Sequence, residues 1–245
     1  MANHRRKVQG ATTAPADIIV GGLEAVEVRL SAGQEVLAEP GALVALLGQA
    51  EFRASLQGGV WKSIMRRITG ERFWRQRIRA TGPARVILSS GYPGSIVHIR
   101  MDGGTSYICD RGRWLASAGA ISLVPQLEHR MVTGMFAGMG FLRQRLTGQG
   151  DAYLHAVGAV IDYVLPEGVT AMVQARAIVA VESTVQFESV IQGGITGLFG
   201  GEGWFLTRLT GPGRVILQTL DPKQMSKRSF NQQTTGKTVE QTPAT

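Results

Sequence analysis

An octapeptide in the first half of the chain recurs near its C-terminal end. Thr81-Gly-Pro-Ala-Arg-Val-Ile-Leu88 returns 129 residues later as Thr210-Gly-Pro-Gly-Arg-Val-Ile-Leu217, with seven of eight residues identical. A weaker copy, Thr147-Gly-Gln-Gly-Asp-Ala-Tyr-Leu154, lies between them, so the Thr-Gly pairs are 66 and 63 residues apart. Similarity at a regular spacing indicates one structural unit used several times. We therefore predict three tandem modules with pseudo-threefold symmetry, at about residues 18–90, 91–155 and 156–220.

A second landmark has nearly the same period. Gly33 to Gly41, Gly104 to Gly112 and Gly168 to Arg176 are each eight residues apart, and each block is followed by a short apolar run. The starts of the blocks are 71 and 64 residues apart, close to the Thr-Gly spacing. Two independent landmarks with one period make coincidence a poor explanation.

The repeat also defines candidate structural residues. They are the Thr-Gly pairs Thr81-Gly82, Thr147-Gly148 and Thr210-Gly211, and the arginines two residues before each pair, Arg79, Arg145 and Arg208. We expect the three threonines to hold equivalent places. We expect the arginines to bond turn carbonyls or to pair with an acid across modules.

The local patterns are those of strands. Val26-Glu-Val-Arg-Leu30 and Val97-His-Ile-Arg-Met101 alternate apolar with polar residues, which is typical of half-buried strands. Short β-branched runs such as Arg85-Val-Ile-Leu88 are bounded by the many turn residues of a chain with 32 glycines and 9 prolines. The sequence therefore predicts an all-β fold.

The composition of the termini, the apolar runs and the cysteine content constrain the domain organisation and the compartment. Residues 1–17 and 221–245 are polar and poor in aromatic side chains, so we expect a disordered lead and a disordered tail. No apolar run approaches the ~20 residues of a membrane-spanning helix. A single cysteine, Cys109, excludes an intramolecular disulfide and fits a reducing compartment.

No catalytic or metal-binding motif is visible. The four histidines, at positions 4, 98, 129 and 155, form neither H-x-H nor H-E-x-x-H, and no G-x-S-x-G is present. Cys109 has no recognisable partner for nucleophilic chemistry. We therefore predict that the protein is not an enzyme and has no catalytic, metal-binding or cofactor-binding residues and no small-molecule substrate.

Positive charge is concentrated in one segment. The formal net charge is +8, and residues 61–85 alone hold eight Lys or Arg against Glu71. Trp61, Ile64, Met65 and Ile68 recur at the spacing of one helix face, which predicts a short amphipathic helix within 61–68. The candidate docking patch comprises Trp61, Lys62, Ile64, Met65, Arg66, Arg67, Arg72, Arg75, Arg77 and Arg79. A merely solvated basic face is the alternative for these residues.

Several motifs together resemble the altered inheritance of mitochondria 24 family. They include Gly58-Gly59, Gly70-Glu-Arg-Phe-Trp74, Pro93-Gly-Ser-Ile96, Arg113-Trp-Leu-Ala-Ser117 and Gly211-Pro-Gly-Arg-Val-Ile-Leu-Gln218, and the resemblance spans roughly residues 18–220. It implies a fold similar to that of the tryptophan RNA-binding attenuator protein, a double-stranded β-helix in three tandem copies. The chain is similar to prokaryotic cytoplasmic members, with a mitochondrial location as the alternative.

One departure from the repeat concerns spacing. Gly70 and Gly82 are two residues farther apart than Gly201 and Gly211, so we expect a local turn of the first module to differ.

We interpret the chain as a non-enzymatic β scaffold of a poorly characterised family. It is expected to form a homo-oligomer, a trimer or a larger ring, and to dock on a protein partner or an anionic membrane surface through residues 61–79. The alternative is a nucleic-acid-binding module. We favour the scaffold because the basic residues gather in one module, whereas a ring-shaped RNA reader would repeat them in each.

Overall fold

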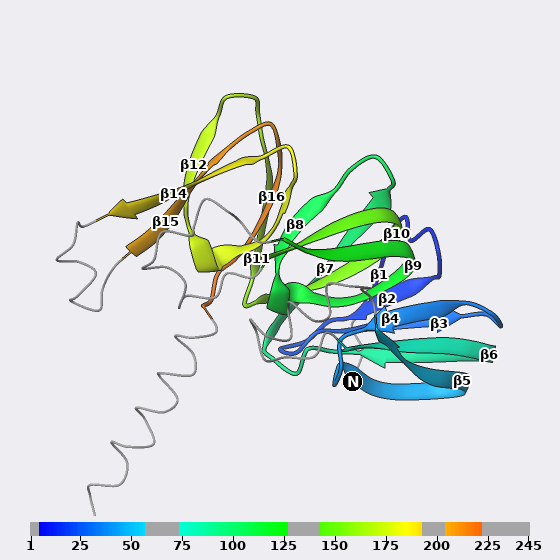
Figure 1. Ribbon diagram of the computed structural model, residues 1–245. Helices are drawn as coiled ribbons and strands as arrows, with labels where there is room; N and C mark the ends of the chain where they lie inside the picture. Colours follow the sequence, from blue (N-terminus) through cyan, green and yellow to red (C-terminus); the bar gives the residue numbers. More distant parts are fainter. Residues whose placement is uncertain (1–4, 57–73, 127–142, 193–203, 222–245) are drawn as a thin grey trace, which may run out of the picture.

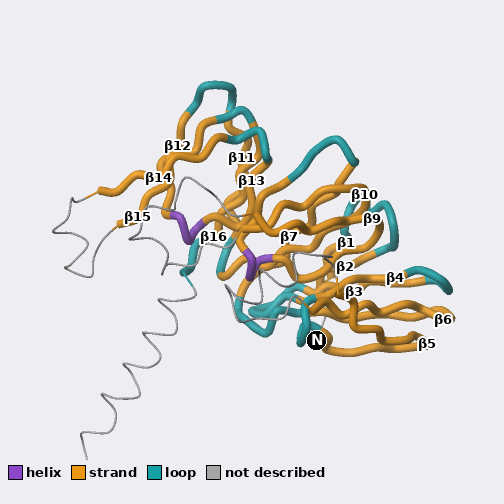
Figure 2. The backbone as a smooth tube through the Cα atoms, viewed as in Figure 1, coloured by secondary structure: helices purple, strands orange, loops and turns teal. Residues whose placement is uncertain are grey.

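The computed structural model describes residues 5–56, 74–126, 143–192 and 204–221 (Figure 1). In this part of the chain every regular element is a strand, apart from the single 3-10 turns Arg111–Arg113 and Ala175–Ala177 (Figure 2). The predicted all-β class is therefore confirmed. The helix expected within 61–68 and the tail from residue 222 onward lie outside the described residues. No described helix has the length and apolarity to cross a membrane.

The strands follow one another in three sets after an N-terminal hairpin. The hairpin consists of β1 (Arg5–Lys7) and β2 (Ala16–Ile19). The first strand set holds β3 (Ala25–Leu30), β4 (Glu35–Ala38), β5 (Leu43–Leu56) and β6 (Trp74–Leu88). The second set holds β7 (Gly94–Asp102), β8 (Tyr107–Asp110), β9 (Trp114–Gln126) and β10 (Arg143–Val157). The third set holds β11 (Val160–Leu165), β12 (Thr170–Gln174), β13 (Ile178–Glu182), β14 (Gln186–Gln192), β15 (Trp204–Thr210) and β16 (Gly213–Gln218).

Antiparallel pairing organises each set around its last long strand. β6 pairs with β3, β4 and β5, and β10 pairs with β7, β8 and β9. In the third set this role is divided, because β16 pairs with β11 and β13 while β15 pairs with β12 and β14. Two further pairs, β4 with β9 and β8 with β13, join the first two sets and the β11, β13 and β16 strands of the third into one 13-stranded sheet, whereas β12, β15 and β14 form a separate three-stranded sheet.

The alternating sequence patterns become strands whose apolar face is buried, although in β3 the polar Glu27 is buried as well. In β3, Val26, Val28 and Leu30 are buried while Arg29 is exposed, and in β7 the apolar residues at 97, 99 and 101 are buried while Arg100 is exposed. Successive side chains of a strand point to opposite faces, so this alternation places one face in the core.

The core is divided along the chain. One apolar cluster is drawn mainly from residues 14–96, a second mainly from 97–156 and a third mainly from 165–217. A few residues cross these limits: Tyr153 packs in the first cluster, and Ile216 packs in the second. Burial of apolar surface therefore stabilises each strand set and also links each set to the next.

The N-terminal segment is ordered, so the prediction of a disordered lead is wrong for residues 5–17. β1 pairs with β2 from Arg5↔Ile19 to Lys7↔Asp17, and Ala14 and Ala16 are buried in the first cluster. The prediction was wrong because it rested on the polar composition of the segment alone. Its polar groups find partners in residues far along the chain.

Candidate functional site

Most of the predicted docking patch lies outside the described residues. This applies to Trp61, Lys62, Ile64, Met65, Arg66, Arg67 and Arg72. Of the three remaining residues, all on β6, Arg79 is exposed and Arg77 forms an ion pair with Glu35 at 3.0 Å.

Arg75 was assigned to the docking patch, but the structure buries this residue. Its residue is only 7% exposed, and its guanidinium lies 5.0 Å from the centroid of the Trp114 ring. Burial lowers the pKa of Arg75 below its ordinary value. Arg75 therefore packs between strand sets, where no membrane or partner can reach it.

The repeated Thr-Gly pairs lie within or at the end of the long strands. A register shift leaves Val44, Leu115 and Val179 without a ladder partner in β5, β9 and β13. The residues seven positions after Val44, Leu115 and Val179 lie opposite Arg79, Thr147 and Thr210, respectively. Thr147 and Thr210 thus hold corresponding places, and Thr81 does not.

The cause is a bulge in β6. Its ladder with β5 passes from Ala50↔Ala80 directly to Gly48↔Ala84, so Thr81–Pro83 face one residue of β5. This is the two-residue excess that the glycine spacing indicated. The same displacement moves Arg79, which lies opposite Glu35, whereas Arg145 lies opposite Ile108 and Arg208 lies opposite Met172. Arg77, opposite Leu37, holds the corresponding place in the first set.

The repeated arginines bind partners near their own strands. Arg208 pairs with Glu188 of the neighbouring strand at 2.7 Å. Arg145 donates to the Ser106 hydroxyl at 3.3 Å, and that hydroxyl in turn bonds Ser183 at 2.7 Å. Only the Arg145 contact therefore extends from one strand set to the next.

A charged pair recurs between the first and last strands of each set. The pairs are Glu27–Arg85, His98–Asp151 and Asp162–Arg214, joined at 2.8, 2.8 and 2.7 Å. Each pair is diagonal in its ladder, because the residue two places after the first member lies opposite the second. These pairs were not predicted from the sequence. Their signal was Arg, Asp and Arg at the fifth position of the repeated octapeptide.

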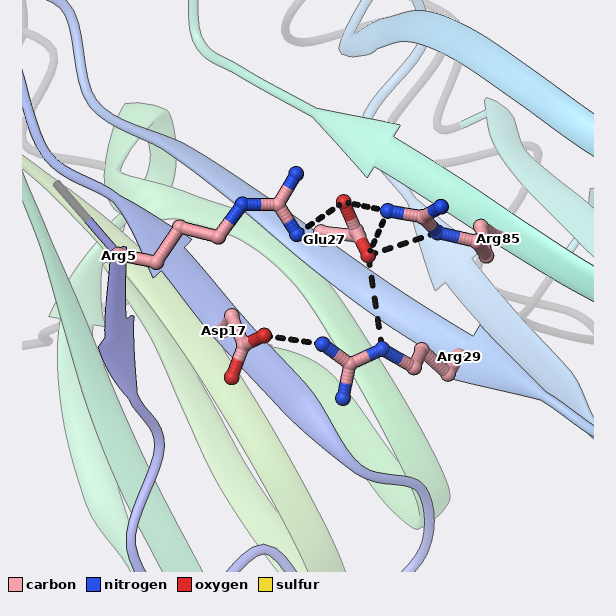
Figure 3. A network of polar contacts seen from close by, with 5 residues as sticks. All are labelled: Arg5, Asp17, Glu27, Arg29 and Arg85. Atoms are coloured by element: carbon pink, nitrogen blue, oxygen red, sulfur yellow. Dashed lines mark hydrogen bonds and ion pairs between the residues drawn. The ribbon is translucent and has the colours of Figure 1, made fainter. Parts of the chain in front are cut away.

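The first of these pairs belongs to a larger cluster, in which Glu27 accepts from three arginines (Figure 3). Arg85 binds the fully buried Glu27 carboxylate in a bidentate manner at 2.8 and 2.9 Å. Arg5 of β1 approaches it at 3.1 Å, and Arg29 approaches at 3.5 Å while also binding Asp17. The cluster thus fastens the N-terminal hairpin to β3 and β6.

In the middle pair the acid lies on the last strand of the set instead of a basic residue, and its surroundings explain the exchange. The buried Asp151 carboxylate accepts hydrogen bonds from the backbone N–H groups of Thr12 and Thr13, at 2.8 and 2.9 Å. An arginine has only donors and could not bind these groups. Burial would raise the pKa of Asp151, but the hydrogen bonds from His98, Thr13 and Thr12 outweigh it and lower the pKa.

A groove of about 550 Å³ lies beside two of the pairs. Its wall includes Arg6, Glu24 and His98, together with Asp162 and Arg214. The two acids of this wall already have partners, since Arg214 binds Asp162 and the Glu24 carboxylate accepts the backbone N–H of Ile96 at 2.7 Å. Among the described residues no group of three or more His, Cys, Asp or Glu side chains could hold a metal ion.

One largely buried acid, Asp110, has a strongly displaced pKa. Burial raises the pKa of Asp110 to about 6, although Arg143 and Arg113 act in the opposite direction. Arg143 lies 3.8 Å from the carboxylate and stacks over the Phe187 ring at 4.3 Å. Burial also raises the pKa of the adjacent Cys109 thiol well above its ordinary range, which makes it a poor nucleophile.

This shift predicts a pH-dependent stability. Between about pH 4 and pH 6 folded Asp110 retains its proton more firmly than unfolded Asp110, so the free energy of unfolding should fall as pH rises through this window. A shift of about two units corresponds to roughly 3 kcal/mol. We expect Asp110→Asn to remove this component in urea unfolding at pH 4 to 7. The exposed Asp102→Asn is the control and should retain it; equal pH profiles for the two variants would contradict the assignment.

The junctions between strand sets are short antiparallel ladders. Val36, Leu37 and Ala38 of β4 lie opposite Ala118, Ser117 and Ala116 of β9. Tyr107, Ile108 and Cys109 of β8 lie opposite Glu182, Val181 and Ala180 of β13. Most of these side chains are buried by the contact.

β12 holds the same place in its set as the junction strands β4 and β8, and β5 holds the same place as β9 and β13, but neither β12 nor β5 has a junction partner among the described strands. β5 pairs only with β6, and β12 pairs only with β15, among the strands that the structure describes. Three of their apolar side chains are exposed: Val44 by 63%, Leu47 by 50% and Met172 by 45%. These two open edges, Leu43–Leu47 and Thr170–Gln174, form the candidate functional site.

The fold and these contacts define an all-β protein whose strand sets are joined edge to edge. The family described as mitochondrial biogenesis AIM24 matches residues 17–220, so the chain belongs to that family and the resemblance is confirmed. The crystal structure of protein SPYM3_0169 from Streptococcus pyogenes is similar, with 18% sequence identity and a TM-score of 0.71. The match covers 94% of this chain and 99% of that one, and at this identity it shows the fold alone. No curated protein matches the chain.

Proposed function

We propose that the protein is a non-enzymatic β scaffold that self-associates. The observation that carries the proposal is the pair of open strand edges, β5 and β12, with exposed Val44, Leu47 and Met172. Proteins usually protect exposed edges with charges, proline or bulges. Neither Leu43–Leu47 nor Thr170–Gln174 contains a charge or a proline. Such edges favour association with another strand.

The scaffold consists, in this proposal, of three attenuator-like double-stranded β-helix modules. The strand order supports it, because each set begins with one strand and continues with a short strand, and the long final hairpin of the first two sets corresponds to the four shorter strands β13 to β16 of the third. The register shift at Val44, Leu115 and Val179 and the diagonal charged pairs also recur. Pseudo-threefold symmetry is the finer prediction, and superposition of the three sets in a crystal structure would test it.

Self-association should be visible in solution. Because two apolar edges are exposed on one chain, light scattering at tens of micromolar should give a mass well above the 26.3 kDa of the monomer. We expect a trimer or a larger ring. A mass that remains that of the monomer at 100 μM, in low and in moderate salt, would reject the scaffold proposal.

The scaffold is further proposed to dock on a protein partner or an anionic membrane through residues 61–79. Of the described part of this segment, Arg79 supports the proposal because it is exposed on β6. The compartment that we propose is the cytoplasm, with the mitochondrion as the alternative.

The docking proposal predicts a charge-dependent interaction. Changing Lys62, Arg66 and Arg67 to Glu should abolish flotation with anionic vesicles, because each basic residue near such a surface contributes about 1 kcal/mol. Changing Lys7, Arg100 and Arg208 to Glu, an equal charge change at exposed residues elsewhere, should leave flotation nearly intact. Binding of single-stranded RNA that falls steeply with salt would instead favour the nucleic-acid alternative. Flotation equal for both variants would reject this docking surface.

A further inference from the structure

We infer that β12 of one molecule pairs with β5 of a second copy, in a register that the chain itself already uses twice. This inference rests on the proposed self-association and specifies its surface.

The internal junctions define the geometry. Three ladder arginines hold corresponding places opposite the short strands: Arg77 lies opposite Leu37, Arg145 opposite Ile108 and Arg208 opposite Met172. At the two junctions, Leu37 lies opposite Ser117 and Ile108 opposite Val181. Met172 is therefore the residue of β12 that should lie opposite the corresponding residue of a third junction.

The receiving strand is identified by its register shift. Ser117 and Val181 each come two residues after the residue without a ladder partner, Leu115 in β9 and Val179 in β13. In β5 that residue is Val44, so Leu46 is the counterpart. The third junction then pairs Val173 with Ala45, Met172 with Leu46 and Ala171 with Leu47, antiparallel as at the other two.

Exposure differs at the positions where this pairing is absent. Leu115 and Val179 are fully buried, whereas their counterpart Val44 is largely exposed. Leu37 and Ile108 are buried, whereas their counterpart Met172 is 45% exposed. The apolar residues that two junctions cover are thus present at the third and left uncovered.

The partner strand must come from another molecule. β5 and β12 lie at opposite ends of the curved array of strands, with the whole second set between them (Figure 1). One molecule therefore offers both halves of the junction but cannot join them. Such a head-to-tail contact leaves one free edge at each end of a dimer, so it continues until a ring closes or a filament forms.

Cysteine pairing tests the contact and its register. Leu47→Cys and Ala171→Cys are made as separate proteins, because directly opposed residues of antiparallel strands lie about 4.5–5.5 Å apart, within reach of a disulfide. After mild oxidation, a covalent dimer is expected only when the two proteins are mixed. The native Cys109 is buried and does not compete. Val169→Cys mixed with Leu47→Cys is the out-of-register control and should cross-link at least tenfold less.

A chain that carries both Leu47→Cys and Ala171→Cys discriminates between the outcomes. A ladder of covalent oligomers or a closed ring supports the inference, and a disulfide within one chain overturns it. Light scattering of the same samples separates the two proposals. Oligomers without a cross-link refute this junction but leave self-association standing, whereas monomers refute both.

A second variant tests the edge without cysteine chemistry. Met172→Lys places a charge in the junction and should weaken association at least tenfold in a scattering titration. Val124→Lys, at an equally exposed apolar residue of β9 away from both edges, should leave association unchanged. Far-UV circular dichroism confirms that both variants are folded. Equal association of the two variants would contradict the edge contact.

Discussion

Replacing Glu27 by Gln is expected to lower the free energy of unfolding by about 3 kcal/mol, because removal of one partner from a buried ion pair leaves the other charges uncompensated. Glu27 is fully buried and accepts from Arg5, Arg29 and Arg85. The amide retains the size of the side chain but loses the charge that three guanidinium groups share. Urea unfolding at pH 7 measures the loss.

The third strand set supplies a matched control. Asp162 binds Arg214 with the same diagonal, bidentate geometry, but its side chain is 40% exposed. Exposed ion pairs contribute only about 0–1 kcal/mol, so Asp162→Asn should have a small effect. Similar losses for Glu27→Gln and Asp162→Asn would show that burial does not determine the strength of these pairs.

Gly148→Ala is the second change with a large expected effect, a loss of about 4 kcal/mol or more that many folded domains do not survive. Gly148 has φ of +106°, and a Cβ there would lie 2.0 Å from the carbonyl oxygen of Ala120 in β9. Both atoms are backbone or rigidly attached to it, so β9 and β10 must separate. Soluble yield and the urea midpoint report the result.

Gly33→Ala separates this clash from the cost of the backbone conformation. Gly33 also has positive φ, +86°, but no atom lies within 4 Å of the position its Cβ would take. Left-handed conformation alone costs a non-glycine residue about 1–2 kcal/mol. We expect the variant to fold with a loss of that size. A Gly148→Ala protein as stable as Gly33→Ala would mean that the strands are not packed this closely.

Together, the ion pairs and the open edges indicate how one sequence unit serves different purposes. The fifth position of the octapeptide is Arg85, Asp151 or Arg214, and its partner on the first strand changes with it. Asp151 of the second set accepts hydrogen bonds from the N-terminal segment. The third set leaves its short strand β12 without a partner on one side among the described strands. The three sets therefore differ in which neighbours their corresponding residues contact.

The features that the sequence alone determined are local ones. Period-2 alternation predicted β3 and β7, and glycine-bounded β-branched runs predicted β6 and β16, because the side-chain period of a strand is two and turns need permissive residues. The extra spacing between Gly70 and Gly82 indicated an irregularity, which the structure places at Thr81–Pro83. The all-β class followed from these patterns together.

Only the tertiary structure decided which residues met. Arg75 looks like its neighbours in the sequence, but in the structure its guanidinium lies over the ring of Trp114, the first residue of β9. Residues 5–17 look disordered by composition, yet Glu27 and Asp151 bind them. The same holds for Leu37 and Met172, which are apolar residues of similar strands, one covered by β9 and one exposed. Local sequence patterns indicate which residues form a strand, whereas the burial of a side chain depends on which distant strand packs against it.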